Sequence, residues 1–251
     1  MPKKAGVPAA APANWFRRLL RVAVRVLLVA VALSVLSVLL LRWVNPVTSA
    51  FMLRRQLEAW GDGEKRFTLQ HQWVPLKSIA PAMPMALMAG EDQKFPEHWG
   101  FDVEAIADAV EDRLEGKSTR GASTLTQQVA KNLYLWPGQS WVRKAFEVYF
   151  TLLIEAFWPK ERILEMHLNL AEYGNGVYGV EAASRVNFKK SAAHLSLHES
   201  AMLVAVLPNP KVRKVNAPVP SVKRRTGWIV DQAERLGPEA EALAHGWAVK
   251  K

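Results

Sequence analysis

The chain has 251 residues, a formal net charge of +10 and no cysteine. This length fits one sizeable domain with an appendage, and the absence of cysteine excludes structural disulfides, thiolate zinc sites and cysteine nucleophiles. The positive charge points to an anionic partner, a class that includes nucleic acid, phosphate-bearing substrates and acidic membrane surfaces.

The first predicted element is a membrane-spanning helix over residues 19–43, because the stretch from Val26 to Leu41 carries no charged side chain. Lysines and arginines gather before this stretch, so the positive-inside rule makes residues 1–18 a cytoplasmic tail and places the rest of the chain outside the cytoplasm. A cleaved signal peptide ending near residues 48–50 is the competing interpretation. A buried core helix fits poorly, because the segment contains arginines and has no polar face.

Residues 44–74 are predicted to be a linker that leads into a domain covering residues 75–251. No helical period is visible over residues 45–80, and residues 67–74 alternate like a short strand. From residue 81 the apolar pattern becomes helical. The predicted helices cover residues 82–90, 103–114, 125–135, 141–158, 160–172, 197–207 and 221–236, with Asp102, Thr124, Ser140 and Ser196 as N-caps. Because no long alternating series of strands follows, the fold class is predicted to be mainly α rather than a sandwich or a doubly wound sheet.

An acidic pair stands at the start of the segment EDQKFPEHWGFD, residues 91–102. Glu91 and Asp92 end an apolar helix. Partial desolvation there, beside Phe95 and Trp99, would raise a carboxyl pKa and make the group a usable base near neutral pH. The alternative is a helix-end carboxylate that pairs with a nearby lysine or histidine.

A second candidate segment covers residues 120–132 and opens a helix. Gly121 would let the backbone approach a ligand, and Ser123 and Thr124 lie at the helix N-terminus, where free N–H groups favour anions. Polar side chains that could grip a phosphate or a sugar follow on the next turns, namely Gln127, Gln128 and Lys131. The alternative is a capped, solvated helix.

A third segment, residues 142–147, places Arg143 and Glu147 four residues apart on a helix, with Lys144 beside them. This spacing is common for a local ion pair. Two cations beside an acid would also suit an oxygen-rich substrate with a diphosphate leaving group.

A fourth segment, residues 160–169, carries two polar side chains on a helix with an apolar face. Asn169 is either a buried packing residue or a substrate contact. His167 has no metal partner four residues on, which favours a structural role. The chain also lacks the HExxH zinc motif, a phosphate-binding P-loop, the dinucleotide glycine fingerprint and the GxSxG nucleophile motif.

Taken together and in this order, the four segments resemble the peptidoglycan glycosyltransferase family (glycosyltransferase family 51) in its monofunctional form. The matching segments are EDQKFPEHWG (residues 91–100) for EDxxFxxHxG, GASTLTQQ (121–128) for GxSTxTQQ, RKAFE (143–147) for RKxxE and KERILEMHLN (160–169) for KxxILxxYLN. One departure is His167, which stands where the family pattern has tyrosine. The chain ends at Lys251, too early for the transpeptidase domain of bifunctional relatives, so we expect glycan polymerisation without peptide cross-linking.

The resemblance implies a lysozyme-like α-helical fold and an inverting transfer reaction. The donor is a glycan on undecaprenyl diphosphate, the acceptor is the GlcNAc 4-hydroxyl of lipid II, and the product is a β-1,4 bond. A lytic hydrolase with a catalytic glutamate is the nearest rival, and the clustered cations favour a diphosphate substrate instead. A membrane-anchored scaffold or nucleic-acid binder is a further rival, but a domain outside the cytoplasm is not expected to meet nucleic acid.

The resemblance also implies roles for individual residues. Glu91 is the general base, and Glu147 is a second acid near the diphosphate. The substrate-binding residues are expected to be Asp92, Phe95, His98, Ser123, Thr124, Gln127, Gln128, Lys131, Arg143, Lys144 and Asn169. No organic cofactor is expected, and the diphosphate is neutralised either by a divalent cation such as Mg²⁺ near Glu147 or by lysine and arginine. The expected partners are lipid II, lipid-linked glycan, the cytoplasmic (inner) membrane bilayer, and proteins of cell-wall synthesis or division.

Overall fold

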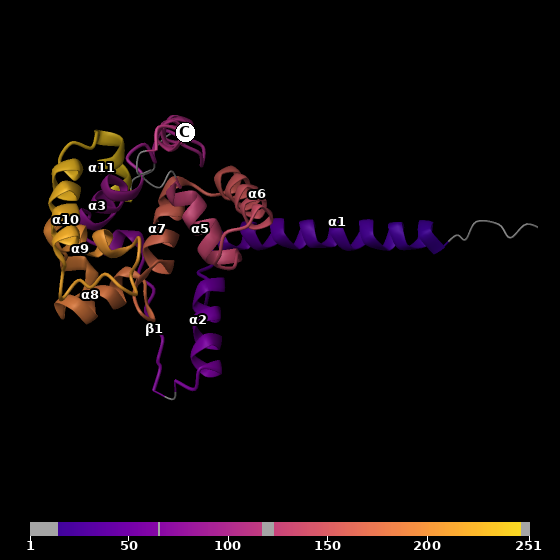
Figure 1. Ribbon diagram of the computed structural model, residues 1–251, viewed down its shortest axis with the longest axis horizontal. Helices are drawn as coiled ribbons and strands as arrows, with labels where there is room; N and C mark the ends of the chain where they lie inside the picture. The colour runs from indigo at the N-terminus through magenta and orange to yellow at the C-terminus, as the bar shows by residue number, and fades with distance from the viewer. Residues whose placement is uncertain (1–14, 65, 117–122, 247–251) are drawn as a thin grey trace, which may run out of the picture.

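The computed structural model describes residues 15–64, 66–116 and 123–246. Its most conspicuous feature is helix α1 (Trp15–Leu41), which projects from the helical body as a single rod (Figure 1). The 27 residues of α1 correspond to about 40 Å at about 1.5 Å per residue, and the helix is long and apolar enough to cross a membrane. An apolar helix is therefore present where the spanning segment was predicted, although it starts before residue 19 and ends at Leu41.

The base of α1 is attached to the body rather than joined to it by a loose tether. Val38 is fully buried, and its carbonyl accepts a hydrogen bond from the Trp158 indole N–H (2.7 Å). Ser34 and Tyr149 share a hydrogen bond of 2.7 Å between their hydroxyl oxygens. The Arg162 guanidinium donates to the carbonyl of Leu41 (2.9 Å), which satisfies the C-terminal end of the helix. These contacts fix the direction in which α1 leaves the body.

Helix α2 (Ala50–Gly61) lies within the region where no helix was expected, and that expectation is wrong. Its buried face includes Arg55, whose guanidinium donates to Glu64 (2.9 Å) and Asn175 (3.0 Å). A buried arginine interrupts the apolar period by which a helix is recognised in a sequence. The partner Asn175 comes 120 residues later, so the local sequence carries no sign of it.

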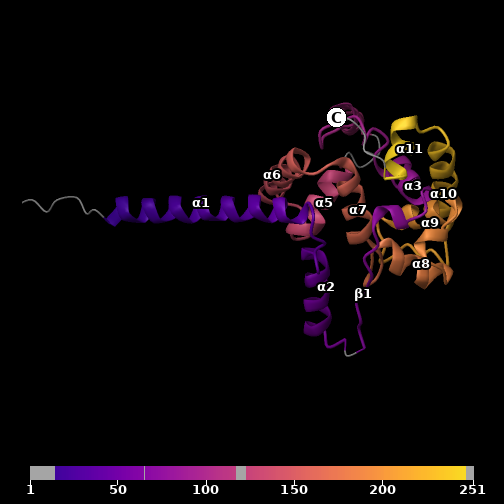
Figure 2. The ribbon, with the colours of Figure 1, turned by 180° about the vertical axis from the view of Figure 1, so that it is seen from behind.

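A small sheet joins the start of the domain to its middle. It has the strand order β1 (Gln70–His71), β3 (Val177–Tyr178), β2 (Glu172–Gly174), with β1 and β3 parallel and β2 and β3 antiparallel. The predicted strand over residues 67–74 is thus reduced to two paired residues. Figure 2 shows β1 beside α2 at the same end of the body.

The rest of the described chain is helical, so the mainly α fold class is confirmed. The helices are α3 (Ala82–Glu91), α4 (Val103–Leu114), α5 (Leu125–Tyr134), α6 (Trp141–Phe157), α7 (Lys160–Leu170), α8 (Val180–Phe188), α9 (Leu197–Val206), α10 (Pro220–Ala233) and α11 (Pro238–Ala244), with 3-10 turns η1 (Leu76–Ser78) and η2 (Ala192–His194). Every helix predicted after residue 81 is present, and Asp102, Thr124, Ser140 and Ser196 cap their helices as expected. Helices α8 and α11 were not predicted, because both are short and bury mainly small side chains.

Helix α3 lies at the centre of the core, packed against α9 and α10. Its Met83, Leu87 and Met88 are fully buried, so most of the apolar run that predicted this helix belongs to the core. Helix α4 is the opposite case, because it has no buried residue and exposes Val103 and Leu114.

Candidate active site

Glu91 is the last residue of α3 and the centre of the site. Its carboxylate accepts a hydrogen bond from the Gln128 side-chain amide (3.0 Å) and another from the Arg225 guanidinium (2.9 Å). Arg225 belongs to α10 and reaches Glu91 because α3 approaches α9 and α10 closely at Gly90. A Cβ atom on Gly90 would lie only 2.6 Å from Val204 Cγ1. The sequence analysis did not identify Arg225, and the basic character of the predicted helix over residues 221–236 was its only signal.

The surroundings of Glu91 raise the pKa of its carboxyl group. Burial is the largest cause, since it disfavours the charged form. The hydrogen bond from Gln128 and the charges of Arg225 and Lys131 oppose this effect without cancelling it. A carboxylate whose pKa is raised towards neutrality is a stronger proton acceptor than an exposed one, as a general base requires.

Gln128 connects Glu91 to the interior of the body. Its side-chain oxygen lies 2.9 Å from His167 Nε2, on α7. His167 is completely enclosed, and burial together with the positive charge of Lys131 lowers its pKa to about 3. The imidazole is therefore neutral at physiological pH.

A cationic cluster surrounds the second acid, Glu147. The side chain of Glu147 is buried, and it accepts a hydrogen bond from Arg143 (2.6 Å) and pairs with Lys144. Burial lowers the pKa of Lys131, while the charges of Glu147 and Glu91 oppose this, so Lys131 is within electrostatic reach of both acids. With Arg225, four cations face two carboxylates. This imbalance favours an anionic ligand group between Glu91 and Glu147.

The residues around Glu147 do not build a metal site of their own. Both carboxylate oxygens of Glu147 are engaged by Arg143 and Lys144. Across the described ranges, no group of three or more His, Cys, Asp or Glu side chains could hold a metal ion. Among the described residues, the positive charge beside Glu147 is carried by Lys131, Arg143 and Lys144.

Asp92, Phe95 and His98 form the wall behind Glu91. Asp92 accepts a hydrogen bond from the backbone N–H of Leu125 (2.9 Å) and contacts His98 Nε2 (2.9 Å). Phe95 is fully buried, with Lys160 Nζ 4.5 Å from its ring centroid. The geometry gives these side chains a supporting role, because they fasten the start of α5 to the end of α3.

Thr124 and Gln127 are likewise enclosed at the start of α5. The Thr124 hydroxyl donates to the carbonyl of Gly100 (2.7 Å), and the Gln127 side-chain oxygen accepts from the backbone N–H of Thr124 (3.0 Å), which completes the predicted capping box. Ser123 is exposed at the helix entrance. Arg120 and Gly121, from the same predicted segment, lie outside the described residues.

Asn169 is a buried packing residue, one of the two roles considered for it. Its side chain is fully enclosed, and it exchanges hydrogen bonds of 2.9 Å with the backbone N–H and C=O of Val74. It also donates to the carbonyl of Glu165 (2.9 Å). These contacts tie the start of the domain to α7.

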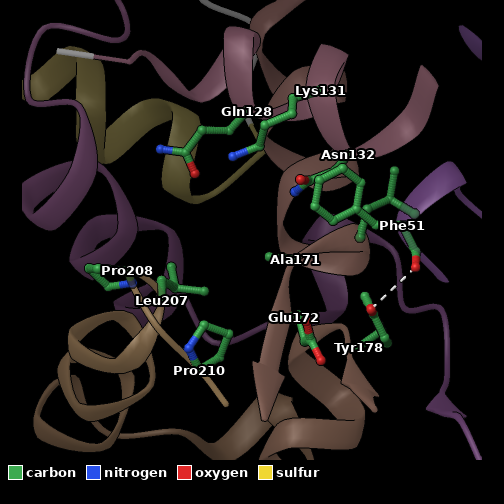
Figure 3. A pocket seen from close by; sticks show the side chains of 11 residues that line it. Phe51, Gln128, Lys131, Asn132, Ala171, Glu172, Tyr178, Leu207, Pro208 and Pro210 are labelled. Atoms are coloured by element: carbon green, nitrogen blue, oxygen red, sulfur yellow. Dashed lines mark hydrogen bonds between the residues drawn. The ribbon is translucent and has the colours of Figure 1, made fainter. Parts of the chain in front are cut away.

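A cavity of about 230 Å³ opens beside Gln128 and Lys131. Figure 3 shows both side chains on one wall, with Leu207, Pro208 and Pro210 on another wall. The remaining lining residues are Phe51, Asn132, Leu170, Ala171, Glu172 and Tyr178. Sequence reasoning missed most of this cavity, because Phe51 lies on the unpredicted helix α2 and Tyr178 on the short strand β3.

The site therefore combines a partly buried carboxylate, Glu91, with neighbouring lysine and arginine side chains. Comparison with known proteins identifies the family. The family model described as Transglycosylase matches residues 61–234. The chain belongs to the transglycosylase family. The matched region contains Glu91, Gln128, Glu147 and Arg225, so the whole site falls within the transglycosylase domain.

Similar proteins cover nearly the whole transglycosylase chain. The biosynthetic peptidoglycan transglycosylase of Xanthomonas campestris pv. campestris is 51% identical over 228 residues, which are 91% of this chain and 93% of the relative. The protein of the same name from Xanthomonas axonopodis pv. citri is 51% identical over 231 residues, 92% of this chain and 94% of the relative. That from Xylella fastidiosa is 49% identical over 231 residues, 92% and 93% of the two chains.

Proposed function

We propose that this transglycosylase polymerises peptidoglycan glycan strands from lipid II, with Glu91 as the general base. The observation that carries the proposal is that Glu91, a partly buried carboxylate of raised pKa, lies within electrostatic reach of Lys131, which also reaches Glu147 and its paired cations. Relatives that share about half of the residues over most of both chains are named biosynthetic peptidoglycan transglycosylases, which supports the same substrate class.

In the proposed reaction, Glu91 accepts the proton of the acceptor 4-hydroxyl while that oxygen forms a bond to the donor anomeric carbon. The bond from the anomeric carbon to the diphosphate oxygen breaks, and the diphosphate leaves with the electron pair. One base and a stabilised leaving group are sufficient for such an inverting displacement, so no covalent protein nucleophile is needed. The raised pKa of Glu91 suits the proton transfer.

The leaving diphosphate is stabilised in this proposal by Lys131, Arg143 and Lys144. Positive groups held in place before the reaction stabilise developing negative charge without reorganisation. Glu147 keeps Arg143 and Lys144 in position through its two carboxylate oxygens. No step of the proposed reaction passes through a metal ion.

The lipid-borne substrate gives α1 a role. We propose that α1 crosses the cytoplasmic membrane once, with the N-terminus in the cytoplasm and the catalytic domain outside, because basic residues precede the apolar stretch. Helix α6, which packs against α1, exposes Trp141, Val142 and Phe146. An apolar surface beside a membrane-spanning helix is suited to the lipid interface.

The test is polymerisation of purified lipid II by the full-length protein and by the variant Glu91→Gln. Glu91→Gln keeps the size of the side chain but removes the base, and a general base contributes about 10²- to 10⁴-fold to a rate, so we expect at least a hundredfold loss. Glu97→Gln is the matched control, because Glu97 is exposed, and its rate should equal that of the unmodified protein. Full activity of Glu91→Gln would refute the assignment of the base. Shortening of pre-made glycan without polymer formation would refute the proposed reaction in favour of hydrolysis.

A further inference from the structure

Three side chains from three helices form a continuous hydrogen-bonded chain that ends at the proposed base. Glu91 on α3 accepts from Gln128 Nε2 on α5 at 3.0 Å, and Gln128 Oε1 lies 2.9 Å from His167 Nε2 on α7. Gln128 lines the cavity described above and Glu91 is partly exposed, whereas His167 is completely enclosed. The reaction outlined above uses Glu91 and gives His167 no task.

The chemistry of the three groups fixes the direction of the chain. An ionised carboxylate can only accept hydrogen bonds, so Gln128 must turn its NH₂ group towards Glu91. Its oxygen then faces His167, and an oxygen acceptor needs a donor, so the proton of the neutral imidazole must sit on Nε2. No hydrogen-bond partner is found for the buried His167 Nδ1 within the described ranges, which is consistent with an unprotonated Nδ1. His167 therefore donates a hydrogen bond to Gln128, and Gln128 donates a hydrogen bond to Glu91.

We propose that His167 is a positioning residue for the transferase reaction: its Nε2–H holds the Gln128 amide in the one orientation that donates to the Glu91 carboxylate. This inference rests on the proposed function of Glu91 as the base. Without the imidazole donor, the amide oxygen loses its hydrogen-bond partner, and only the carboxylate itself still orients the amide. The Gln128 NH₂ group also has a competing acceptor, the carbonyl of Ser123 at 3.5 Å.

The orientation of Gln128 matters for the acid–base behaviour of Glu91. The groups that act on Glu91 are Gln128 and Lys131 from α5, Arg225 from α10, and the hydroxyl of Tyr173 from β2. Gln128 and Lys131 are the groups that act on His167. The Gln128 hydrogen bond lowers the pKa of Glu91 against the effect of burial. Loss of that bond therefore raises the pKa, and because a base works in its ionised form, the acidic limb of the pH–rate profile moves to higher pH.

The experiment measures the pH dependence of kcat and KM for lipid II polymerisation by the full-length protein and two His167 variants. His167→Leu has a similar volume but no donor. We expect the acidic limb of its pH–rate profile to move up by about one pH unit, with kcat about tenfold lower on that limb. On the alkaline plateau, kcat should stay near that of the unmodified protein. KM should change less than about twofold. In His167→Gln, the side-chain amide can place an N–H near the original Nε2 position, and the limb should return to that of the unmodified protein.

Two further variants separate positioning from packing. Gln128→Leu removes the same donation to Glu91 from the other end of the chain, and adding His167→Leu to it should shift the limb no further, because residues that act through one another are not additive. His71→Phe is the control for losing another histidine hydrogen bond, that from His71 Nε2 to the carbonyl of Asn169 (3.1 Å). It should leave the acidic limb in place even if the melting temperature falls.

The possible results distinguish the inference from the function on which it rests. A loss of rate in His167→Leu that is equal at every pH, with no movement of the limb and no rescue in His167→Gln, would overturn the positioning role and leave the proposed function intact. If the acidic limb of the pH–rate profile stayed in place in Gln128→Leu, the positioning role of His167 would be overturned even if His167→Leu failed to fold. An unmodified protein that polymerises no lipid II would overturn the function itself.

Discussion

Adding one methyl group at Gly90 tests whether the close packing of α3 positions the base. A Cβ atom at Gly90 would lie 2.6 Å from Val204 Cγ1 and 3.2 Å from Ile229 Cδ1. Val204 and Ile229 are fully buried and β-branched, so their rotamers cannot easily give way. Gly90→Ala therefore has to push α3 away from α9 and α10, which carries Glu91 with it.

The size of the effect follows from two opposing contributions. Overpacking a close-packed core costs about 1–3 kcal/mol, while alanine in a helix is about 1 kcal/mol more favourable than glycine. The clash is on two sides, so we take the upper part of the range and expect a net loss of about 1–2 kcal/mol. For a domain of this size that lowers the melting temperature by about 2–8 °C. A misplacement of about 1 Å can reduce a rate about a hundredfold, so a shift of a few tenths of an ångström at Glu91 should reduce kcat about tenfold.

The assay is kcat for lipid II polymerisation together with thermal unfolding of the full-length protein. Gly227→Ala is the matched control, since Gly227 lies in α10 and an added Cβ there meets nothing within 4 Å. That variant should be at least as stable as the unmodified protein and fully active. Val204→Ala alone should be destabilised by a cavity, but combined with Gly90→Ala it should recover stability and kcat, because the new methyl group occupies the vacated space. A Gly90→Ala protein with unchanged stability and rate would refute the reasoning.

Two more predictions concern charged side chains. Arg225→Met removes the cation that donates to Glu91, which raises the pKa of Glu91 further. The acidic limb of kcat should then move to higher pH, with about a tenfold loss on that limb. Arg224→Met, at the exposed neighbouring residue, is the control. If the acidic limb of Arg225→Met did not move, the proposed effect of Arg225 on the pKa of Glu91 would be contradicted. Lys160→Met removes the cation that pairs with the buried Glu155 carboxylate, 2.9 Å from Lys160 Nζ, and should cost about 3–5 kcal/mol in denaturant unfolding. Lys190→Met, at a partly exposed pair, should cost less than about 1 kcal/mol, and equal costs at the two sites would contradict the argument.

The parts of this fold that could be predicted from the sequence are those whose causes lie within a few residues. Asp102 and Ser140 each accept a hydrogen bond from a backbone N–H three residues ahead, so the signal and the structure occupy the same short window. The position of Glu91 at the end of α3 could be predicted for a similar reason, because the apolar run that it ends is visible in the sequence.

The parts that could not be predicted depend on residues far apart in the sequence. Arg225 meets Glu91 across 134 positions, and nothing near either residue indicates the pairing. The enclosure of Phe95 and Asn169 is also a tertiary outcome. A motif names the residues that recur at a site, but it does not distinguish a side chain that faces the ligand from one that holds the wall in place.

The attachment of α1 bears on how a growing strand can move. The Arg162 guanidinium donates hydrogen bonds to the carbonyls of Leu41 (2.9 Å) and Val44 (2.8 Å). No flexible linker would therefore separate a bilayer-crossing helix from the catalytic domain. A domain on a loose tether would sample many heights above the lipid surface. If α1 crosses the bilayer as proposed, the folded protein sets the height of Glu91 above the membrane, and movement of the growing strand then falls to the lipid-borne glycan.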